Sequence, residues 1–538
     1  MPVAMASDQQ LFEPKQGSDI TYEDMVDERE ALGESQIQKL FTGTTILVTG
    51  GTGFVGKLLV EKLLRSCPNL KRIYLLGRPK KNKDIAKRLE EQFNDVLYDR
   101  LRKEQPDFTK KVTIVEGDVG FINLAMKDED RKRLISEVEI IFHGAATVRF
   151  DEALKKAVEV NVRGTREMLL LARACTKLRA MVHVSTAYSN CILREIEEKI
   201  YDTSLPAEKL IDLVENLDEK IMEKITPGLI GEYPNTYAYT KSVAEDIVRK
   251  YSKGLPVVLF RPAIMIATAK EPVAGWIDNI YGPTGVVLGA GLGLLHVLKC
   301  NPSAVADVVP GDMVINSMIA AAWKVVRDSP GNHEDAPPAE LPPPVYNYVS
   351  SVQKPLTWQR FISLIEKGPS EVPSQHAVWH ALFVPTPSTF FFNFICFFMH
   401  WIPAYTVDAV ASLIGKKPML KKAYTKIDKF SEVISYFALR EWKFKNDNVQ
   451  RLFNEMSDAD KNVFDFDIGS LDWTDYAHNY VRGIRVYLIK DPMDTLDIGR
   501  RHYQKLKLMH YTSCAILGLV LFMSIWGVFQ WLFLNLSR

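Results

Sequence analysis

The sequence predicts an α/β fold in which a doubly wound parallel sheet is followed by a mostly helical C-terminal domain and a C-terminal transmembrane helix. Three observations support this fold class. Short apolar runs alternate with helical patterns through residues 41–370, a glycine-rich segment joins the first run to the first helical pattern, and residues 511–536 contain no charged residue. Strands that are apolar on both faces and alternate with helices are typical of a parallel sheet covered on both sides.

The expected elements follow one another in a regular order. The expected strands are 46–48, 72–76, 112–115, 139–142, 180–184, 256–260 and 345–349. Helical patterns between them include 57–64, 153–177 and 237–250. Proline and acidic residues in 331–344 predict a surface loop before the last strand.

A chain of 538 residues is too long for one compact domain. We divide it into a mobile N-terminal leader (1–40), a cofactor-binding catalytic domain (41–370), a mostly helical domain (371–510) and a membrane anchor (511–536). The leader lacks the apolar segment of a secretory signal.

Charge and cysteine content argue against two kinds of site. The formal net charge is +1, whereas binding to nucleic-acid phosphates needs a basic excess. The six cysteines are scattered, without a Cys-x-x-Cys pair or a histidine at zinc-like spacing. This pattern is typical of a reduced intracellular protein and predicts neither a disulfide framework nor a metal site.

The apolar C-terminal segment is long enough to span a bilayer. A helix over residues 511–536 would be about 39 Å long, against a hydrocarbon core of about 30 Å; a buried core helix is the alternative. Arg500, Arg501, Lys505 and Lys507 precede the segment and only Arg538 follows it. Because excess basic residues mark the cytoplasmic side, we expect a single-pass tail anchor in the endoplasmic reticulum or the peroxisome, with the catalytic domain in the cytosol.

The glycine-rich segment predicts a dinucleotide site. It consists of Thr49, Gly50, Gly51, Thr52, Gly53, Phe54, Val55 and Gly56. Glycine permits a tight turn, close approach of the backbone to a diphosphate, and packing of the helix on the strand. The positive N-terminus of the helix attracts the diphosphate. Because the segment follows an expected strand and opens an expected helix, we favour this interpretation over a simple glycine turn.

The residues after the second strand distinguish the two nicotinamide cofactors. An acidic residue that binds the ribose hydroxyl is typical of NAD sites, but this sequence has Arg78, followed by the lysine-rich residues 80–83. A guanidinium can pair with a 2′-phosphate, so we predict NADPH; a solvated basic loop is the alternative. Further expected cofactor contacts, which could equally be ordinary loop residues, are Asp118, Val119, Ala145, Ala146 and Thr147.

Four residues predict acid–base chemistry. Tyr237 and Lys241 lie four residues apart, so they share one face of a helix. The reference pKa of tyrosine is about 10, and a neighbouring ammonium favours the phenolate and lowers that pKa. Ser185 and Thr186 follow the fifth strand at its C-terminal edge, where ligands bind in open α/β sheets. A hydroxyl there can hydrogen-bond a substrate carbonyl oxygen.

The strings TGGTGFVG, HVSTAY and YAYTK, in this order, resemble the extended short-chain dehydrogenases/reductases, which have a Rossmann fold. Longer strings resemble the fatty acyl-CoA reductases more closely. They include KLLVEKLLRSCP, IIFHGAATVRFDEAL, HVSTAYSN, PNTYAYTKSVAE, GWIDNIYGPTG and KKPMLKKAYTKIDK. This resemblance covers residues 40–510.

The resemblance implies reduction of a long-chain fatty acyl-CoA to a fatty alcohol by two hydride transfers from NADPH, through a bound aldehyde. Tyr237, helped by Thr186 or Ser185, would stabilise and protonate the oxyanion, and Lys241 would also bind the nicotinamide ribose. Thr186 aligns with the second position of the usual Ser-Ser pair, but the residue type differs, so the choice between the two hydroxyls stays open. Residues that would border the cofactor or substrate are Arg261, Pro262 and 275–285.

Other functions remain as alternatives on the same fold. A sterol dehydrogenase or a nucleotide-sugar epimerase would change the substrate, but the acidic residue that would favour the epimerase is missing after Leu76. A catalytically silent, NADPH-sensing membrane tether would not require Tyr237 and Lys241, which are both present. We therefore favour the reductase.

A second apolar stretch, residues 390–402, is too short for a typical span, and we expect Pro403 to limit its extension. It is either a buried core helix or an amphipathic segment that lies on the bilayer or lines an acyl-chain channel.

Overall fold

The computed structural model describes residues 34–78, 84–329 and 342–536. The basic residues 80–83 and most of the expected loop at 331–344 lie outside these ranges, as do residues 1–33 of the expected leader. The mobile leader was expected to extend to residue 40, but its last residues are folded, so this boundary is wrong. Gln36–Phe41 forms helix α2, in which Ile37, Leu40 and Phe41 are buried. Hydrophobic packing therefore makes this segment part of the folded domain.

A seven-stranded sheet forms the centre of the molecule and confirms the predicted fold class. Its strands lie in the order β11-β7-β5-β4-β1-β2-β3, and every neighbouring pair is parallel. The strands are β1 (Thr45–Thr49), β2 (Arg72–Gly77), β3 (Val112–Glu116), β4 (Ile140–His143), β5 (Ala180–Val184), β7 (Val257–Pro262) and β11 (Val345–Tyr348). All seven expected strands are present, each within two residues of its expected ends.

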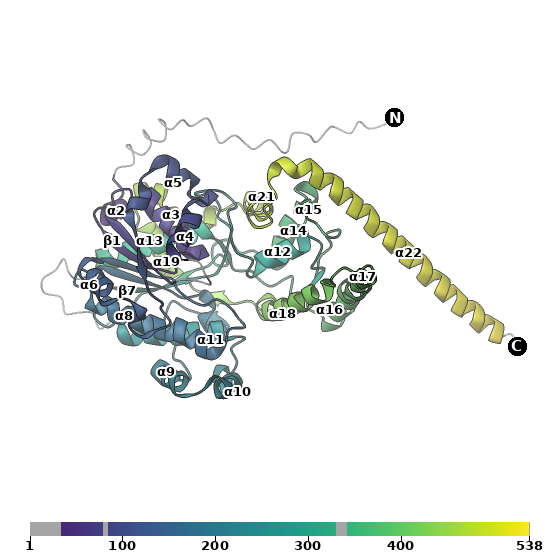
Figure 1. Cartoon of the computed structure of the whole chain (residues 1–538), viewed down its shortest axis with the longest axis horizontal. Coiled ribbons are helices and arrows are strands. Elements are labelled where there is room, and N and C mark those ends of the chain that lie inside the picture. Colours follow the sequence, from purple (N-terminus) through teal and green to yellow (C-terminus); the bar gives the residue numbers. More distant parts are fainter. Residues whose placement is uncertain (1–33, 79–83, 330–341, 537–538) are drawn as a thin grey trace.

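Helices cover both faces of this sheet (Figure 1). Alternate residues of each strand enter two hydrophobic cores: Ile46 and Val48 pack with α3 and α13, whereas Leu47 packs with α8 and α11. The helices of this part are α3 (Phe54–Ser66), α4 (Ile85–Phe93), α5 (Asp99–Glu104), α6 (Asp128–Glu137), α7 (Leu154–Ala157), α8 (Gly164–Ala174), α9 (Ala207–Asn216), α10 (Glu219–Ile230), α11 (Thr236–Tyr251) and α13 (Gly311–Asp328). A π-helical turn, Val158–Arg163, joins α7 to α8.

The C-terminal part of the chain is mostly helical, as predicted. Its helices, together with α12 from the preceding part, are α12 (Pro283–Gly291), α14 (Trp358–Ile365), α15 (Gly368–Glu371), α16 (Thr389–Cys396), α17 (Ile402–Leu413), α18 (Leu420–Ala438), α19 (Asp447–Asn454), α20 (Asp458–Val463), α21 (Trp473–Gly483) and α22 (Leu496–Leu536). Two small parallel strand pairs connect this part to the rest of the chain. They are β9 (Val297–Lys299) with β12 (Val384–Thr386), and β6 (Glu195–Ile196) with β13 (Lys443–Phe444). Another such pair, β8 (Ile264–Ile266) with β10 (Val308–Pro310), lies within the preceding part.

Helix α22 leaves the body of the molecule as one long rod (Figure 1). Its first turns are attached: His502 Nε2 lies 2.8 Å from the carbonyl oxygen of Ala377, and the Trp379 indole donates to His510 Nδ1 at 3.1 Å. The apolar window that follows has a mean hydropathy of 2.0 and is not buried by the rest of the chain. The alternative of a buried core helix is therefore wrong, and the helix is long and apolar enough to cross a membrane.

The segment at 390–402 is part of a longer apolar helix than expected. Thr389–Leu413 is continuous over 25 residues, and Pro403 does not end it. A π-helical turn at Phe397–Trp401 precedes the proline, which then lies in the first turn of α17, a position that tolerates a missing N–H. Only 17% of the apolar window is buried, so the expectation of a core helix is also wrong here.

Candidate active site

A cavity of about 800 Å³ lies at the C-terminal ends of the strands, where the glycine-rich segment, the loops after β4 and β5, and α11 meet. Most of the residues predicted from the sequence line it. These are Gly50, Thr52, Gly53, Phe54, Val55, Gly56, Arg78, Asp118, Val119, Ala145, Ala146, Ser185, Thr186, Tyr237, Lys241 and Pro262. The structure thus brings together residues that are far apart in the sequence, such as Gly50 and Pro262.

Two glycines shape the end of the cavity next to α3. Gly50 has a φ of +75°, and a Cβ atom there would lie 2.9 Å from the backbone nitrogen of Ala145. A Cβ atom on Gly56 would lie 2.2 Å from the carbonyl oxygen of Gly50. The N-cap of α3, Gly53, supplies no side chain to its first N–H groups. These groups are therefore available to a diphosphate at the positive end of the helix.

Two arginines lie beyond the glycine loop. Arg78 donates to Asp118 Oδ2 at 2.9 Å, and its side chain is 54% exposed. Arg88, on α4, also lines the cavity; it donates to Thr52 Oγ1 at 2.8 Å and to the carbonyl oxygen of Arg78 at 2.9 Å. Sequence analysis missed Arg88. Its position shortly after the lysine-rich residues 80–83 was the available signal.

Tyr237 lies in the first turn of α11, beside the loop that follows β5. Asn235 caps this helix by accepting the N–H of Ala238 at 2.8 Å. The hydroxyl groups of Tyr237 and Thr186 share a hydrogen bond. Burial raises the pKa of Tyr237 to about 12. The hydrogen bond to Thr186 lowers this pKa, but its effect is smaller than that of burial. The phenol is therefore neutral and can donate a proton at physiological pH.

Lys241 does not lower the pKa of Tyr237 in this structure, contrary to the expectation from their spacing. Its Nζ donates to the carbonyl oxygen of Val184 at 2.8 Å. Burial lowers the pKa of Lys241 to about 8, while the charge of Glu245 acts in the opposite direction. The ammonium therefore lies at the end of β5 rather than on the phenol oxygen.

Ser185 and Arg261 are held in a buried network next to the cavity. The Ser185 hydroxyl donates to Glu245 Oε1 at 2.6 Å, and Arg261 Nε donates to the same oxygen at 2.9 Å. Arg261 is fully buried and also donates to the carbonyl oxygens of Glu197 and Lys199. The structure thus does not bring Arg261 to the cavity wall. Glu245 was missed, although it follows Lys241 by four residues on α11.

Thr49, Gly51 and Thr147 lie behind the cavity wall. Thr49 Oγ1 is 2.8 Å from His143 Nδ1 and accepts the N–H of Ala145 at 3.2 Å. The N–H of Thr147 donates to Asn161 Oδ1 at 2.9 Å. Both threonines therefore fix the loop after β4. The space beside Gly51 is filled by Leu75, whose Cδ2 would lie 2.9 Å from an added Cβ atom.

The C-terminal part closes the cavity on the side opposite the sheet. Ile434, Phe437 and Ala438 of α18 line it, and the ring of Phe437 lies 5.9 Å from that of Phe150, which in turn lies 5.7 Å from Tyr237. Of the expected substrate border at 275–285, the lining residues are Asp278, Asn279, Tyr281, Gly282 and Pro283.

A group of metal-ligand side chains occurs away from the residues singled out from the sequence. One ligand atom each from Cys396, His400 and Asp428 lie within 4.8 Å of one another. The Nε2 atom of His400 already accepts the N–H of His296 at 3.1 Å. Spacing along the chain could not show this group, because Asp428 lies on a different helix from the other two.

The chain is similar to known proteins over most of its length. A family model described as a male sterility protein, of NAD-binding type, matches residues 48–318, and a second male sterility model matches residues 399–491. The fatty acyl-CoA reductase wat of Drosophila melanogaster is 40% identical over 90% of this chain and 91% of its own length. Fatty acyl-CoA reductase 2 of Homo sapiens is 37% identical, over 90% of this chain and 92% of its own.

Solved structures support the fold. The reductase domain of a nonribosomal peptide synthetase from Mycobacterium tuberculosis aligns with a TM-score of 0.53 at 18% identity, covering 85% of this chain and 97% of that domain. The terminal reductase domain of the myxalamid pathway gives 0.51 at 18%, with 86% and 98% covered. At this identity the likeness concerns the fold alone.

Proposed function

The chain belongs to the fatty acyl-CoA reductase family, and from that premise we propose that it reduces a long-chain fatty acyl-CoA to a primary alcohol and free coenzyme A with two molecules of NADPH. It is an oxidoreductase with a nicotinamide-binding domain. The observation that carries the finer proposal is that Tyr237, Thr186 and Lys241 lie in the same cavity as the glycine loop.

The residues present fit a dinucleotide phosphate. Because Gly50 and Gly56 have no Cβ atom, the loop can fold tightly against α3. No side chain caps the N-terminus of this helix. Arg78 and Arg88 supply positive charge where the adenosine ribose would lie, which supports NADPH over NADH. When bound, the cofactor supplies hydride to the substrate carbonyl carbon.

The protein's own groups handle the proton and the oxyanion. In the first reduction, Thr186 and Tyr237 would hydrogen-bond the thioester oxygen as negative charge develops on it. Coenzyme A would then leave as a thiolate, which takes a proton from solvent, as the carbonyl of an aldehyde reforms. In the second, Tyr237 donates its proton to the aldehyde oxygen, which becomes the alcohol. The Lys241 ammonium, held at the end of β5, would bind the nicotinamide ribose. Ser185 is bonded to Glu245, which supports Thr186 as the substrate-facing hydroxyl.

Membrane attachment suits a substrate with a long aliphatic chain. We propose that the apolar part of α22 anchors the protein once through the endoplasmic reticulum or peroxisomal membrane, with the catalytic part in the cytosol. The exposed apolar helix Thr389–Leu413 supports contact of the body with the same bilayer.

The test is the replacement Tyr237→Phe in the purified full-length chain, supplied with a saturated acyl-CoA and NADPH. Loss of a positioned general acid is expected to lower kcat by roughly 10²- to 10⁴-fold, with NADPH binding retained. Tyr239→Phe is a matched control on the same helix, because the Tyr239 hydroxyl is buried without a hydrogen-bond partner in the described residues. Equal alcohol formation by the two variants would refute the role of Tyr237.

A further inference from the structure

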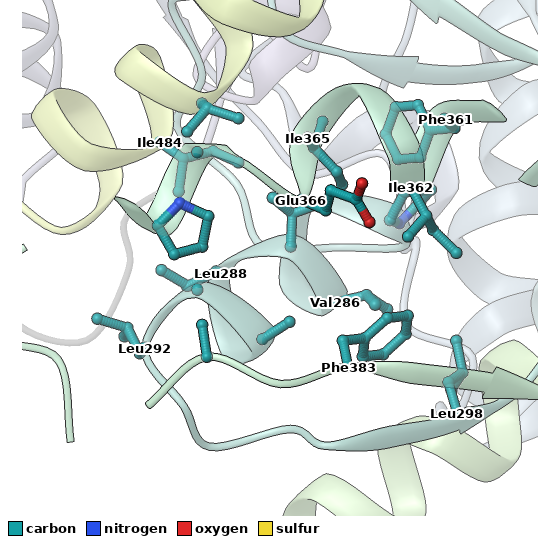
Figure 2. Close-up of a pocket in the computed structure, with 18 of the residues that line it drawn as sticks. Val286, Leu288, Leu292, Leu298, Phe361, Ile362, Ile365, Glu366, Phe383 and Ile484 are labelled. Atoms are coloured by element: carbon teal, nitrogen blue, oxygen red, sulfur yellow. The ribbon is translucent and has the colours of Figure 1, made fainter. Parts of the chain in front are cut away.

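A second cavity, of about 350 Å³, adjoins the first and is lined mainly by apolar side chains. Figure 2 shows Val286 and Leu288 of α12 facing Phe361 and Ile365 of α14 across a common space. The charged exceptions are Glu366, which is exposed, and Arg485, whose guanidinium is bonded to Thr495 at 2.9 Å and lies 3.4 Å from Asp491. The rest of the lining is mainly apolar and suits an aliphatic ligand.

Four residues, called the neck below, form the boundary between the two cavities. Pro283, Trp358, Ile434 and Ala438 line both cavities. Pro283 is the first residue of α12 and Trp358 is the first residue of α14. Both helices therefore begin at the neck and run away from it along the second cavity. The nine residues of α12 run for about 13 Å along the second cavity.

We propose that the second cavity receives the aliphatic tail of the acyl substrate, and that its far end, at Gly291 and Pro369, sets the longest chain accepted. The inference rests on the proposed function, because the catalytic cavity must hold the thioester. An alkyl chain has no hydrogen-bonding group to satisfy. Each methylene buried in the cavity favours binding by about fourfold, the equivalent of roughly 0.8 kcal/mol.

Gly291 marks the position where the cavity can be shortened. A Cβ atom on it would meet Pro369 Cγ at 4.0 Å, an ordinary contact, and Pro369 also lines the cavity. The other nearby glycines offer no such room. A Cβ atom would lie 3.1 Å from Leu295 Cβ at Gly289, and 2.2 Å from the Trp379 carbonyl oxygen at Gly293. A larger side chain at residue 291 therefore occupies the far end without displacing backbone.

The experiment measures kcat/KM of the full-length protein in detergent for saturated acyl-CoAs of graded chain length at fixed NADPH. Gly291→Leu is expected to lower kcat/KM for the longest substrates at least tenfold relative to the shortest, because it displaces two or more methylenes at about fourfold each. Gly228→Leu is the matched control: Gly228 lies on α10, and a Cβ atom there has no neighbour within 4 Å. This control should leave the chain-length profile unchanged.

A wider cavity should shift the preferred chain length in the opposite direction. A variant that widens the cavity also tests the inference if Gly291→Leu does not fold. Leu292→Ala is expected to move the preferred chain length upward. A folded Gly291→Leu variant, or a Leu292→Ala variant, with the wild-type profile would overturn the inference. Binding of a fluorescent polyene fatty acid provides a readout without turnover. If the wild type reduces no acyl-CoA, the proposed function fails, whereas equal binding of this probe to wild type and Gly291→Leu refutes the cavity assignment itself.

Discussion

Replacing Arg78 by alanine should alter the preference of the enzyme for NADPH over NADH. Arg78 and Asp118 form an ion pair at 2.9 Å, but the Arg78 side chain is 54% exposed. Solvent screens such a pair, whose contribution to stability is about 0.2–1 kcal/mol. A hydrogen bond from the guanidinium to a 2′-phosphate is worth about 1.5–3 kcal/mol. The binding free energy lost with the phosphate contact should therefore exceed the free energy of unfolding lost with the ion pair.

That energy corresponds to a decrease of about 10- to 150-fold in kcat/KM for NADPH. NADH has no 2′-phosphate, so its kcat/KM should hardly change. Because Arg88 keeps part of the positive charge, we expect the lower end of this range for Arg78→Ala and a larger loss when Arg88 is replaced as well.

The assay is the initial rate with each cofactor at a fixed acyl-CoA concentration. Arg100→Ala serves as the control, because Arg100 forms a comparable surface ion pair with Glu104 at 2.7 Å and does not line the cavity. An unchanged ratio of the two kcat/KM values in Arg78→Ala, or an equal fall for both cofactors, would refute the assignment of this end of the cavity to the phosphate.

Two further predictions concern pH and membrane attachment. Burial lowers the pKa of Lys241 to about 8, and we propose that its charged form binds the nicotinamide ribose. The value of kcat/KM should therefore fall as the pH rises through about 8, and a profile that stays level to pH 10 contradicts this role. Deletion of residues 511–538 should release the protein from carbonate-washed membranes while leaving reductase activity in detergent, and retention in the membrane would show that α22 is not the main anchor.

The sequence predicts the backbone of the site better than the partners of its side chains. The strand ends and the face of α11 depend on local patterns, and Tyr237, Lys241 and Thr186 accordingly reach one cavity. Arg261 does not, because its partner Glu245 comes from α11 and could not be identified from the strand itself. The continuation of the apolar helix through Pro403 depends on a π-helical turn, which hydrophobic spacing does not reveal.

Three polar side chains on one face of α11 have different hydrogen-bond partners at the site. Tyr237, Lys241 and Glu245 recur every four residues, so each is one helical turn from the next. Glu245 binds Arg261 and the hydroxyl of Ser185, and Lys241 binds the end of β5. Of the three, only Tyr237 is hydrogen-bonded to a cavity-lining hydroxyl that has no acidic partner in the described part of the chain. That hydroxyl belongs to Thr186. The hydrogen bond from Ser185 to Glu245 therefore supports our proposal that Thr186 and Tyr237, rather than Ser185, act on the substrate oxygen.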